Sequence, residues 1–148
     1  MTVDANAGFT INPGIDLTVD GALINHAGIS GVTIQSDITG TGSLIESSGN
    51  INGTLEQYLT QNQWHFIGIP VESATASVFY LPNGSDIYLK THNEATNTFG
   101  SFITDINTPL IQGRGYECWV DNNINQGEVI QFAGVLNSGD YTTGSGNF

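Results

Sequence analysis

Glycine and asparagine interrupt this chain so often that no long regular helix fits between them. There are 19 glycines among 148 residues, and both residue types favour turns because they tolerate positive backbone φ angles. The segments between the turns are short and rich in Val, Ile, Thr and aromatic residues, which is typical of strands. No segment has a convincing 3.6-residue hydrophobic period. The sequence therefore predicts an all-β fold.

The first 54 residues alternate between short apolar segments and Gly- or Asn-rich turns. Apolar clusters at residues 15–19, 22–24, 32–34 and 43–46 recur without a fixed period. This pattern is typical of a short β-solenoid, in which aliphatic side chains point inward and Gly or Asn forms the corners. A twisted β-meander is the alternative. We expect residues 1–54 to form one of these two structures as a first segment.

Residues 55–148 form a second expected segment, because they contain both tryptophans and most of the other aromatic residues. Residues 63–70 are predicted to form a buried central strand that is apolar on both faces and ends at Pro70. Further strands are expected at residues 77–81, 86–91, 98–103, 115–120 and 129–136. Their spacing predicts an antiparallel β-sandwich or jelly roll, which can share one core with the first segment.

The net charge of −12 restricts the partners of this chain. Lys90 and Arg114 are its only Lys or Arg residues, whereas binding to nucleic acid needs clustered cations that neutralise phosphates. Anionic membrane surfaces are disfavoured for the same reason, and no 18-residue apolar stretch predicts membrane insertion. We interpret the diffuse acidity as a device for solubility, with a role in binding divalent cations as the alternative.

Cys118 is the only cysteine, so the chain has no internal disulfide. It lies in the apolar run at residues 116–120 and is expected to be a small buried hydrophobic residue. A catalytic thiol needs a base and electropositive surroundings, and no partner motif surrounds this cysteine. We therefore expect a structural thiol.

The two ends of the chain favour an internal piece of a larger protein. The first residues have neither the basic nor the apolar region of a signal peptide. The last residues, 141–148, begin like another strand or linker. We therefore expect a fragment that is truncated at both ends.

Nine short segments are recognisable together in the order in which they occur. They span residues 17–25, 31–37, 40–45, 54–59, 64–71, 93–99, 108–110, 113–116 and 132–140. As a series they resemble the β-rich stalk or spacer segment that precedes the C-terminal sorting domain in large type IX-secreted surface proteins of Bacteroidota. The resemblance implies a secreted or bacterial outer-surface location, neighbouring domains of a larger parent chain as partners, and no catalytic residues.

These observations together predict a non-catalytic structural module and not an enzyme. We expect a stalk, spacer or self-assembling unit of a secreted bacterial cell-surface or extracellular protein. Exposed β edges would let such units pair with one another. The alternative is a carbohydrate-binding module appended to a secreted enzyme or adhesin, with a polysaccharide as its partner.

No constellation of residues predicts catalysis. His65 lies in an apolar strand, while His26 and His92 lie in separate turns, and no spacing typical of metal ligands connects them. The carboxylates also show no spacing that singles out a glycosidase pair, and we interpret them as solvated surface groups. These carboxylates are Glu46, Glu56, Glu72, Asp86, Asp105, Glu117 and Asp121.

Residues 121–128 offer several oxygen ligands for a cation. Asp121, Asn123 and Asn125 have an approximate D-x-N-x-N spacing. An EF-hand loop needs Gly at its sixth position and Glu at its twelfth, and this chain has Gln126 and Phe132 there. We therefore interpret the segment as a turn and expect no cofactor, with Ca²⁺ bound in another loop geometry as the alternative.

Exposed aromatic rings can stack on sugar rings, which is the basis of the carbohydrate-binding alternative. In the strand at residues 116–120, Glu117 and Trp119 share one face. If the charged Glu117 faces outward, Trp119 is also exposed and can stack on a sugar ring. The sequence favours the other interpretation, in which Trp119 packs in the core of a sandwich. The stacking candidates are Tyr80, Tyr88 and Trp119, with Tyr116 as a further candidate.

Overall fold

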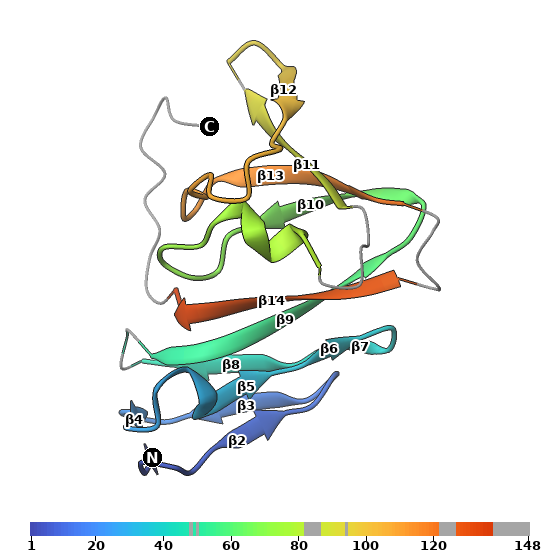
Figure 1. Cartoon of the computed structure of the whole chain (residues 1–148). Helices are drawn as coiled ribbons and strands as arrows, with labels where there is room; N and C mark the ends of the chain where they lie inside the picture. Colours follow the sequence, from blue (N-terminus) through green and yellow to red (C-terminus); the bar gives the residue numbers. More distant parts are fainter. Residues whose placement is uncertain (48, 50, 82–86, 94, 122–126, 138–148) are drawn as a thin grey trace.

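The computed structural model describes residues 1–47, 49, 51–81, 87–93, 95–121 and 127–137. Within these residues the chain forms strands and two short 3₁₀ segments, η1 (Gly28–Ser30) and η2 (Ala76–Phe79), without an α-helix. Figure 1 shows the strands in tiers, from the N-terminal strands at the bottom to β12 at the top. The prediction of an all-β fold is confirmed.

The first strands of the chain form parallel pairs between segments that are not consecutive. β1, β2 and β3 pair in parallel with β4, β5 and β8, in that order. Thr2 lies opposite Ile24 and Asp16 lies opposite Ser43. Two successive passes of the chain therefore lie side by side and run in the same direction. The bounds are Thr2–Val3 (β1), Phe9–Ile11 (β2), Asp16–Val19 (β3), Ile24–Asn25 (β4), Val32–Ile34 (β5) and Ser43–Glu46 (β8).

A small antiparallel hairpin interrupts the second pass. It consists of β6 (Ser36–Asp37) and β7 (Gly40–Thr41). Asp37 closes the turn, because its Oδ1 accepts hydrogen bonds from the amide of Thr39 at 2.7 Å and from the hydroxyl of Thr39 at 2.5 Å. These bonds, above all the one from the hydroxyl, lower the pKa of the Asp37 carboxyl below its ordinary value.

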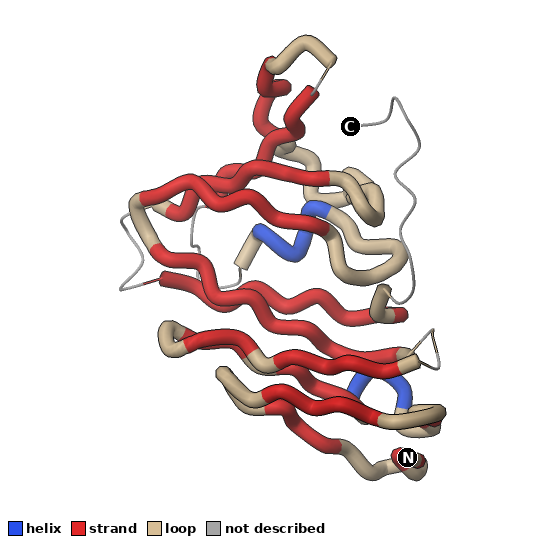
Figure 2. The backbone as a smooth tube through the Cα atoms, turned by 180° about the vertical axis from the view of Figure 1, so that it is seen from behind, coloured by secondary structure: helices blue, strands red, loops and turns tan. Residues whose placement is uncertain are grey.

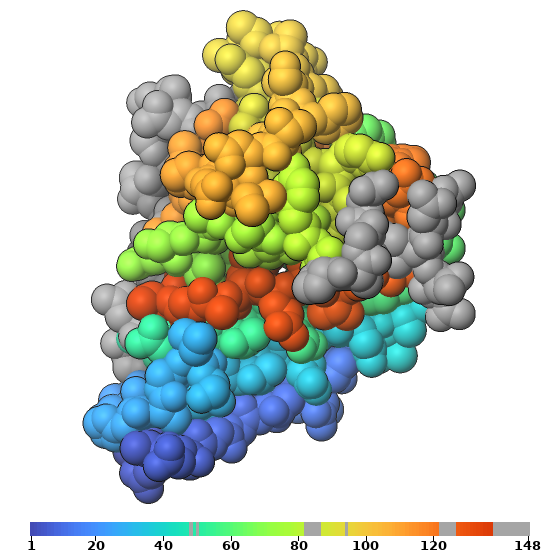
Figure 3. Space-filling model, in the orientation of Figure 1, coloured from blue at the N-terminus to red at the C-terminus, as the bar shows by residue number. Residues whose placement is uncertain are grey.

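β9 (Asn52–Thr60) connects the parallel strands to the rest of the molecule. It pairs in parallel with β5, with Ile34 opposite Leu55, and antiparallel along its whole length with β14 (Gly127–Val135). The resulting sheet has the order β14-β9-β5-β2. Figure 3 shows β14 as a band between the first strands and the upper part of the molecule. One sheet therefore runs through the predicted boundary between residues 54 and 55.

The second four-stranded sheet, here called the upper sheet, is antiparallel and has the order β10-β13-β11-β12. Its strands are β10 (Gln63–Gly68), β11 (Ile87–Asn93), β12 (Thr98–Phe102) and β13 (Gly115–Val120). The prediction that residues 63–70 form a buried central strand is wrong, because β10 lies at an end of this sheet. Only one of its faces is buried: Ile67 is 1% exposed, whereas Phe66 is 73% exposed.

The apolar side chains of the described residues form two clusters. The larger cluster takes residues from both four-stranded sheets, including Leu59, Phe132 and Cys118. The η2 segment occupies the place of the strand predicted at residues 77–81, and it fills this core with Phe79, whose ring lies 6.1 Å from that of Phe132. The smaller cluster lies among the first strands and consists of Val3, Val19, Leu23, Val32 and Ile51.

Cys118 is completely buried in the larger cluster, as the sequence predicts.

Figure 2 shows the same tiers from behind, with the strands running in near-parallel rows. In the described part of the chain, no helix has the length and apolar character needed to cross a membrane.

Candidate functional site

The outer face of the upper sheet carries aromatic side chains in rows that cross the strands. The opposite face packs in the core through Ile67, Leu89 and Cys118. Because side chains alternate along a strand, the intervening residues point outward. We call this outer surface the aromatic face; its rings belong to Trp64, Phe66, Tyr88, Phe99, Phe102 and Trp119.

Two rows are set by the strand register. In the first row, Trp119 of β13 lies between Trp64 of β10 and Tyr88 of β11. In the second row, the partners across the four strands are Phe66, Glu117, Lys90 and Phe102. Directly opposed residues on antiparallel strands lie close enough for their side chains to touch. The register therefore gathers rings that are distant in the sequence.

Four of these rings surround an open hollow of about 300 Å³, lined by Trp64, Tyr88, Phe102 and Trp119. The ring centroids of Trp64 and Trp119 are 5.4 Å apart with planes tilted by 59°. Those of Tyr88 and Phe102 are 5.6 Å apart with a tilt of 56°. The rings therefore form walls of a shallow groove and not a flat platform.

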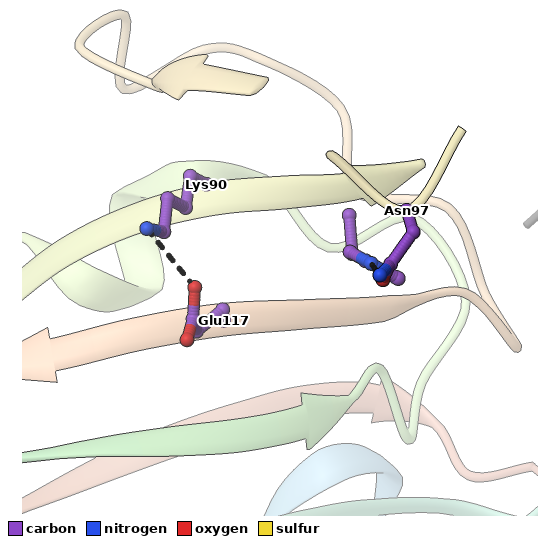
Figure 4. A network of polar contacts seen from close by, with 4 residues as sticks. Lys90, Asn97 and Glu117 are labelled. Carbon is purple, nitrogen blue, oxygen red and sulfur yellow. Dashed lines mark hydrogen bonds and ion pairs between the residues drawn. The ribbon is translucent and has the colours of Figure 1, made fainter. Parts of the chain in front are cut away.

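An ion pair lies within the aromatic face beside the hollow. Lys90 Nζ is 3.1 Å from Glu117 Oε2, and the two side chains are only 16% and 8% exposed. Figure 4 shows the lysine of β11 reaching across to the glutamate of β13. Ring centroids also lie near the ammonium, at 4.1 Å for Trp64 and 4.4 Å for Phe99. Such cation–π contacts and a buried counter-ion hold the charge in place.

A third row continues the face with small residues. Gly68 of β10 lies opposite Gly115 of β13, two residues from Phe66 and Glu117 respectively. A Cβ atom added to either glycine would meet no other described atom within 4 Å. On β11, His92 pairs with Phe99 of β12, and their ring centroids are 4.9 Å apart with planes tilted by 47°. At the two glycines the sheet therefore presents backbone without side chains, beside the ring of Phe66.

The structure brings together two of the three predicted stacking residues, Tyr88 and Trp119. Trp119 is half-buried on the same face as Glu117 and belongs to neither core cluster, so the expectation that it packs in the core is wrong. Tyr80 follows η2, where its hydroxyl donates a hydrogen bond to the carbonyl of Ile103 at 2.8 Å, and it does not line the hollow. Tyr116 is buried in the core.

Sequence reasoning missed Trp64, Phe102 and Lys90. Trp64 and Phe66 lie two residues apart in β10, and this spacing is readable in the sequence because it puts both rings on one face. The contribution of β12 is not readable in this way, because it depends on which strand pairs with β11. Lys90 is also unremarkable until β11 and β13 are placed side by side.

A second hollow, of about 470 Å³, lies between β8 and the segments around Pro70 and Leu136. It is larger, but its walls are mainly aliphatic and contain no aromatic ring. Two of its polar side chains already serve the fold: Ser43 donates to Asp16 at 2.6 Å, and Asn137 donates to the carbonyl of Ile69 at 2.9 Å. We therefore take the aromatic face as the candidate site.

The predicted cation ligands fall mostly outside the described residues. Asp121 directly follows β13, whereas Asn123 and Asn125 belong to the part that the structure does not describe. Among the residues that it does describe, no three His, Cys, Asp or Glu side chains are grouped as a metal site. Binding of Ca²⁺ by this segment stays a prediction.

The residues considered for catalysis have structural contacts. His65 Nε2 lies 2.8 Å from the carbonyl oxygen of Thr60. Glu56 accepts hydrogen bonds from the amide of Ser36 and the side chain of Gln131. Burial, and secondarily the charge of Glu117, raises the pKa of the Cys118 thiol to about 12, so the thiol is protonated at neutral pH.

Comparisons with models of protein families, with curated proteins and with solved structures find no match.

Proposed function

We propose that this chain is a non-catalytic module that binds polysaccharide on its aromatic face. The observation that carries the proposal is the hollow, to which each of the four strands of the upper sheet contributes one ring. Sugar rings have apolar C–H faces that pack on aromatic rings, while their hydroxyls stay in contact with water or polar groups. Aromatic side chains provide large contact areas of this kind.

The arrangement of the rings fits a single sugar chain. Neighbouring strands in a sheet lie about 4.8 Å apart, so a chain laid across the strands meets one ring after another. The ring planes of Trp64 and Trp119 are tilted by 59°, which suits the sides of one chain better than the flat surface of a crystal. Soluble polysaccharides are therefore the expected ligands.

The exposure of these rings supports a binding role. Trp64 and Tyr88 are each 40% exposed and Phe102 is 50% exposed, although burial of aromatic surface is favourable. Contiguous apolar patches of this kind on soluble domains commonly mark binding sites. The sheet and the ion pair also hold the rings in place before a ligand arrives, which reduces the entropy lost on binding.

The wider context of the proposal is a bacterial surface protein. We propose that the parallel strands form a short solenoid-like stack and that the upper sheet and β14-β9 form a sandwich-like unit. The predicted segments 1–54 and 55–148 are then continuous with each other through β9. The parallel register of β1–β4, β2–β5 and β3–β8 supports the first part. The resemblance to segments of type IX-secreted proteins supports secretion and neighbouring domains in a parent chain.

Affinity electrophoresis through gels that contain soluble polysaccharides tests the proposal. Xyloglucan, laminarin, galactomannan and hydroxyethyl cellulose serve as probes, each at several concentrations. We expect at least one to retard the protein, and Trp119→Ala or Trp64→Ala to weaken this retardation at least about fivefold, since one aromatic contact is worth about 1 kcal/mol or more. Tyr80→Ala, on an exposed tyrosine that does not line the hollow, should bind like the unmodified protein.

Retardation that Trp119→Ala and Tyr80→Ala reduce equally would contradict the assignment to this face. Absence of retardation with every probe would contradict polysaccharide binding itself. Denaturant unfolding of each variant separates loss of binding from loss of the fold.

A second candidate function is a spacer or self-assembling unit, and one observation favours it. β2 stands at an end of the β14-β9-β5-β2 sheet and β10 at an end of the upper sheet, and strands with an uncovered edge can pair with another chain. Sedimentation velocity over a wide range of protein concentrations tests this function. Association that Trp119→Ala abolishes would make the aromatic face a protein interface and would overturn the polysaccharide proposal. Association that Trp119→Ala leaves intact would support pairing through the strand edges.

A further inference from the structure

We infer that the aromatic face selects uncharged polysaccharides and discriminates against acidic ones. The inference rests on the proposed polysaccharide binding and names the class of ligand. It follows from the place of the positive charges in this chain: acidic sugars, which carry carboxylates or sulfates, are usually recognised by Lys or Arg side chains that form charge-assisted hydrogen bonds.

Among the residues that the structure describes, the only Lys or Arg side chain on the aromatic face is already paired within the protein. Lys90 Nζ is paired with Glu117 Oε2 at 3.1 Å. It also lies 4.1 Å from the ring centroid of Trp64 and 5.8 Å from that of Phe102. The ammonium is therefore enclosed between rings of β10 and β12 and has its counter-ion beside it.

Arg114, the other fixed positive charge, does not supply a cation to the aromatic face. Lys90 and Arg114 are the only Lys and Arg in the whole sequence. The Cζ atom of Arg114 lies 5.9 Å from the ring of Tyr116, which is buried in the core on the opposite side of the sheet, and Arg114 Nε is itself buried. Apart from His92, whose ring lies against that of Phe99, the described part of the aromatic face thus has no second basic side chain.

An acidic ligand would have to compete with Glu117 for Lys90. Displacing Glu117 would leave a carboxylate that is 6% exposed without its counter-ion, which is strongly unfavourable. The net charge of −12 adds repulsion at long range. An uncharged sugar ring meets neither obstacle, and it gains the same contacts with the four rings of the hollow.

Two matched pairs of soluble polysaccharides test the inference. Hydroxyethyl cellulose is compared with carboxymethyl cellulose, and galactomannan with its carboxymethyl derivative, in affinity gels at low and at high salt. We expect the uncharged member of at least one pair to retard the protein about tenfold more strongly at low salt. High salt should narrow this difference, because it screens charges at the surface, without changing retardation by the uncharged member.

Glu117→Gln tests whether the ion pair sets the preference. It keeps the size of the side chain and leaves Lys90 without a counter-ion, so the affinity for the carboxymethyl polymer relative to its uncharged partner should rise about tenfold. Glu72→Gln is the matched control, because it removes the same charge from an exposed position outside the upper sheet. It should leave the ratio close to that of the unmodified protein.

The outcomes separate the inference from the proposed function. Tighter binding of the carboxymethyl polymers by the unmodified protein would overturn the inference and leave polysaccharide binding standing. Equal effects of Glu117→Gln and Glu72→Gln would overturn the role of the ion pair, since only net charge would then matter. If neither pair nor any earlier probe retards the protein, polysaccharide binding itself fails and the inference falls with it.

Discussion

Lys90 and Glu117 face each other on neighbouring strands with 3.1 Å between Nζ and Oε2, and both side chains are largely shielded from water. The register of β11 and β13 places the two residues directly opposite each other. The pair thus lies between the aromatic rings outside and the core inside. Its contribution to stability depends on both partners being present, because a shielded charge without a partner is costly.

Lys90→Met should destabilise the protein by about 3 kcal/mol, because it leaves the Glu117 carboxylate shielded and without a counter-ion. The measurement is the free energy of unfolding in urea. Lys90→Met combined with Glu117→Leu should recover most of this loss, since the charge is removed as well. If the double variant is as unstable as Lys90→Met alone, the loss comes from the cation–π contacts of the ammonium with Trp64 and Phe99.

Glycines on the aromatic face and in β14 should respond oppositely to substitution. Gly115 has open space for a side chain, so Gly115→Thr should stabilise the protein by about 0.5 kcal/mol through a better strand residue and a less flexible unfolded chain. Gly127 has φ +140°, and an added Cβ would meet the carbonyl oxygen of Leu59 at 2.5 Å. Gly127→Ala should therefore cost about 2 kcal/mol. Urea unfolding of both variants checks the sign of each change in the free energy of unfolding. A destabilised Gly115→Thr would contradict the open space above Gly115.

The sequence predicts part of this site well, because side-chain alternation is a local property. Glu117 and Trp119 can be assigned to one face from residues 116–120 alone. The burial of Trp119 could not be decided in this way, since it depends on what covers that face. In the structure the face is open, and the hydrophobic partners of Trp119 are other surface rings, Trp64 and Tyr88.

The order of the strands was the part that the sequence could not supply. β13 pairs with β10 and β11, which precede it by long stretches of chain, and no local pattern encodes such a pairing. The error about β10 has the same origin: its apolar residues on both faces predict a central strand. Aromatic residues on an exposed face produce the same pattern at the end of a sheet.

Thr39→Val should raise the pKa of Asp37 toward its ordinary value of 3.8, because the hydroxyl of Thr39 is the main cause of its lowered pKa. The sign follows from the charged form: a lowered folded-state pKa means that Asp37 stabilises the β6–β7 turn above pH 3.8. This contribution is lost as the pH falls through the lowered pKa. NMR titration of the Asp37 carboxyl carbon measures the change. An unchanged pKa in Thr39→Val would assign the effect to the backbone amides.

Cys118 should make the protein less stable at alkaline pH and unreactive at neutral pH. Its pKa is raised from 9.0 to about 12 in the folded state, so folding favours the protonated thiol. The stabilisation is complete below pH 9.0 and is lost as the pH rises from there toward 12. At pH ~10.5 the loss should reach about 2 kcal/mol, since one pKa unit corresponds to about 1.4 kcal/mol.

Cys118→Ala isolates this effect from the other groups that titrate at high pH. The difference in free energy of unfolding between the unmodified protein and Cys118→Ala should be constant up to pH 9.0 and should then shift in favour of the variant. A thiol reagent at pH ~8 should modify the folded protein about a thousandfold more slowly than the protein in urea, because three pKa units reduce the thiolate about a thousandfold. Rapid modification of the folded protein would place the thiol at the surface and contradict its position in the core between the two sheets.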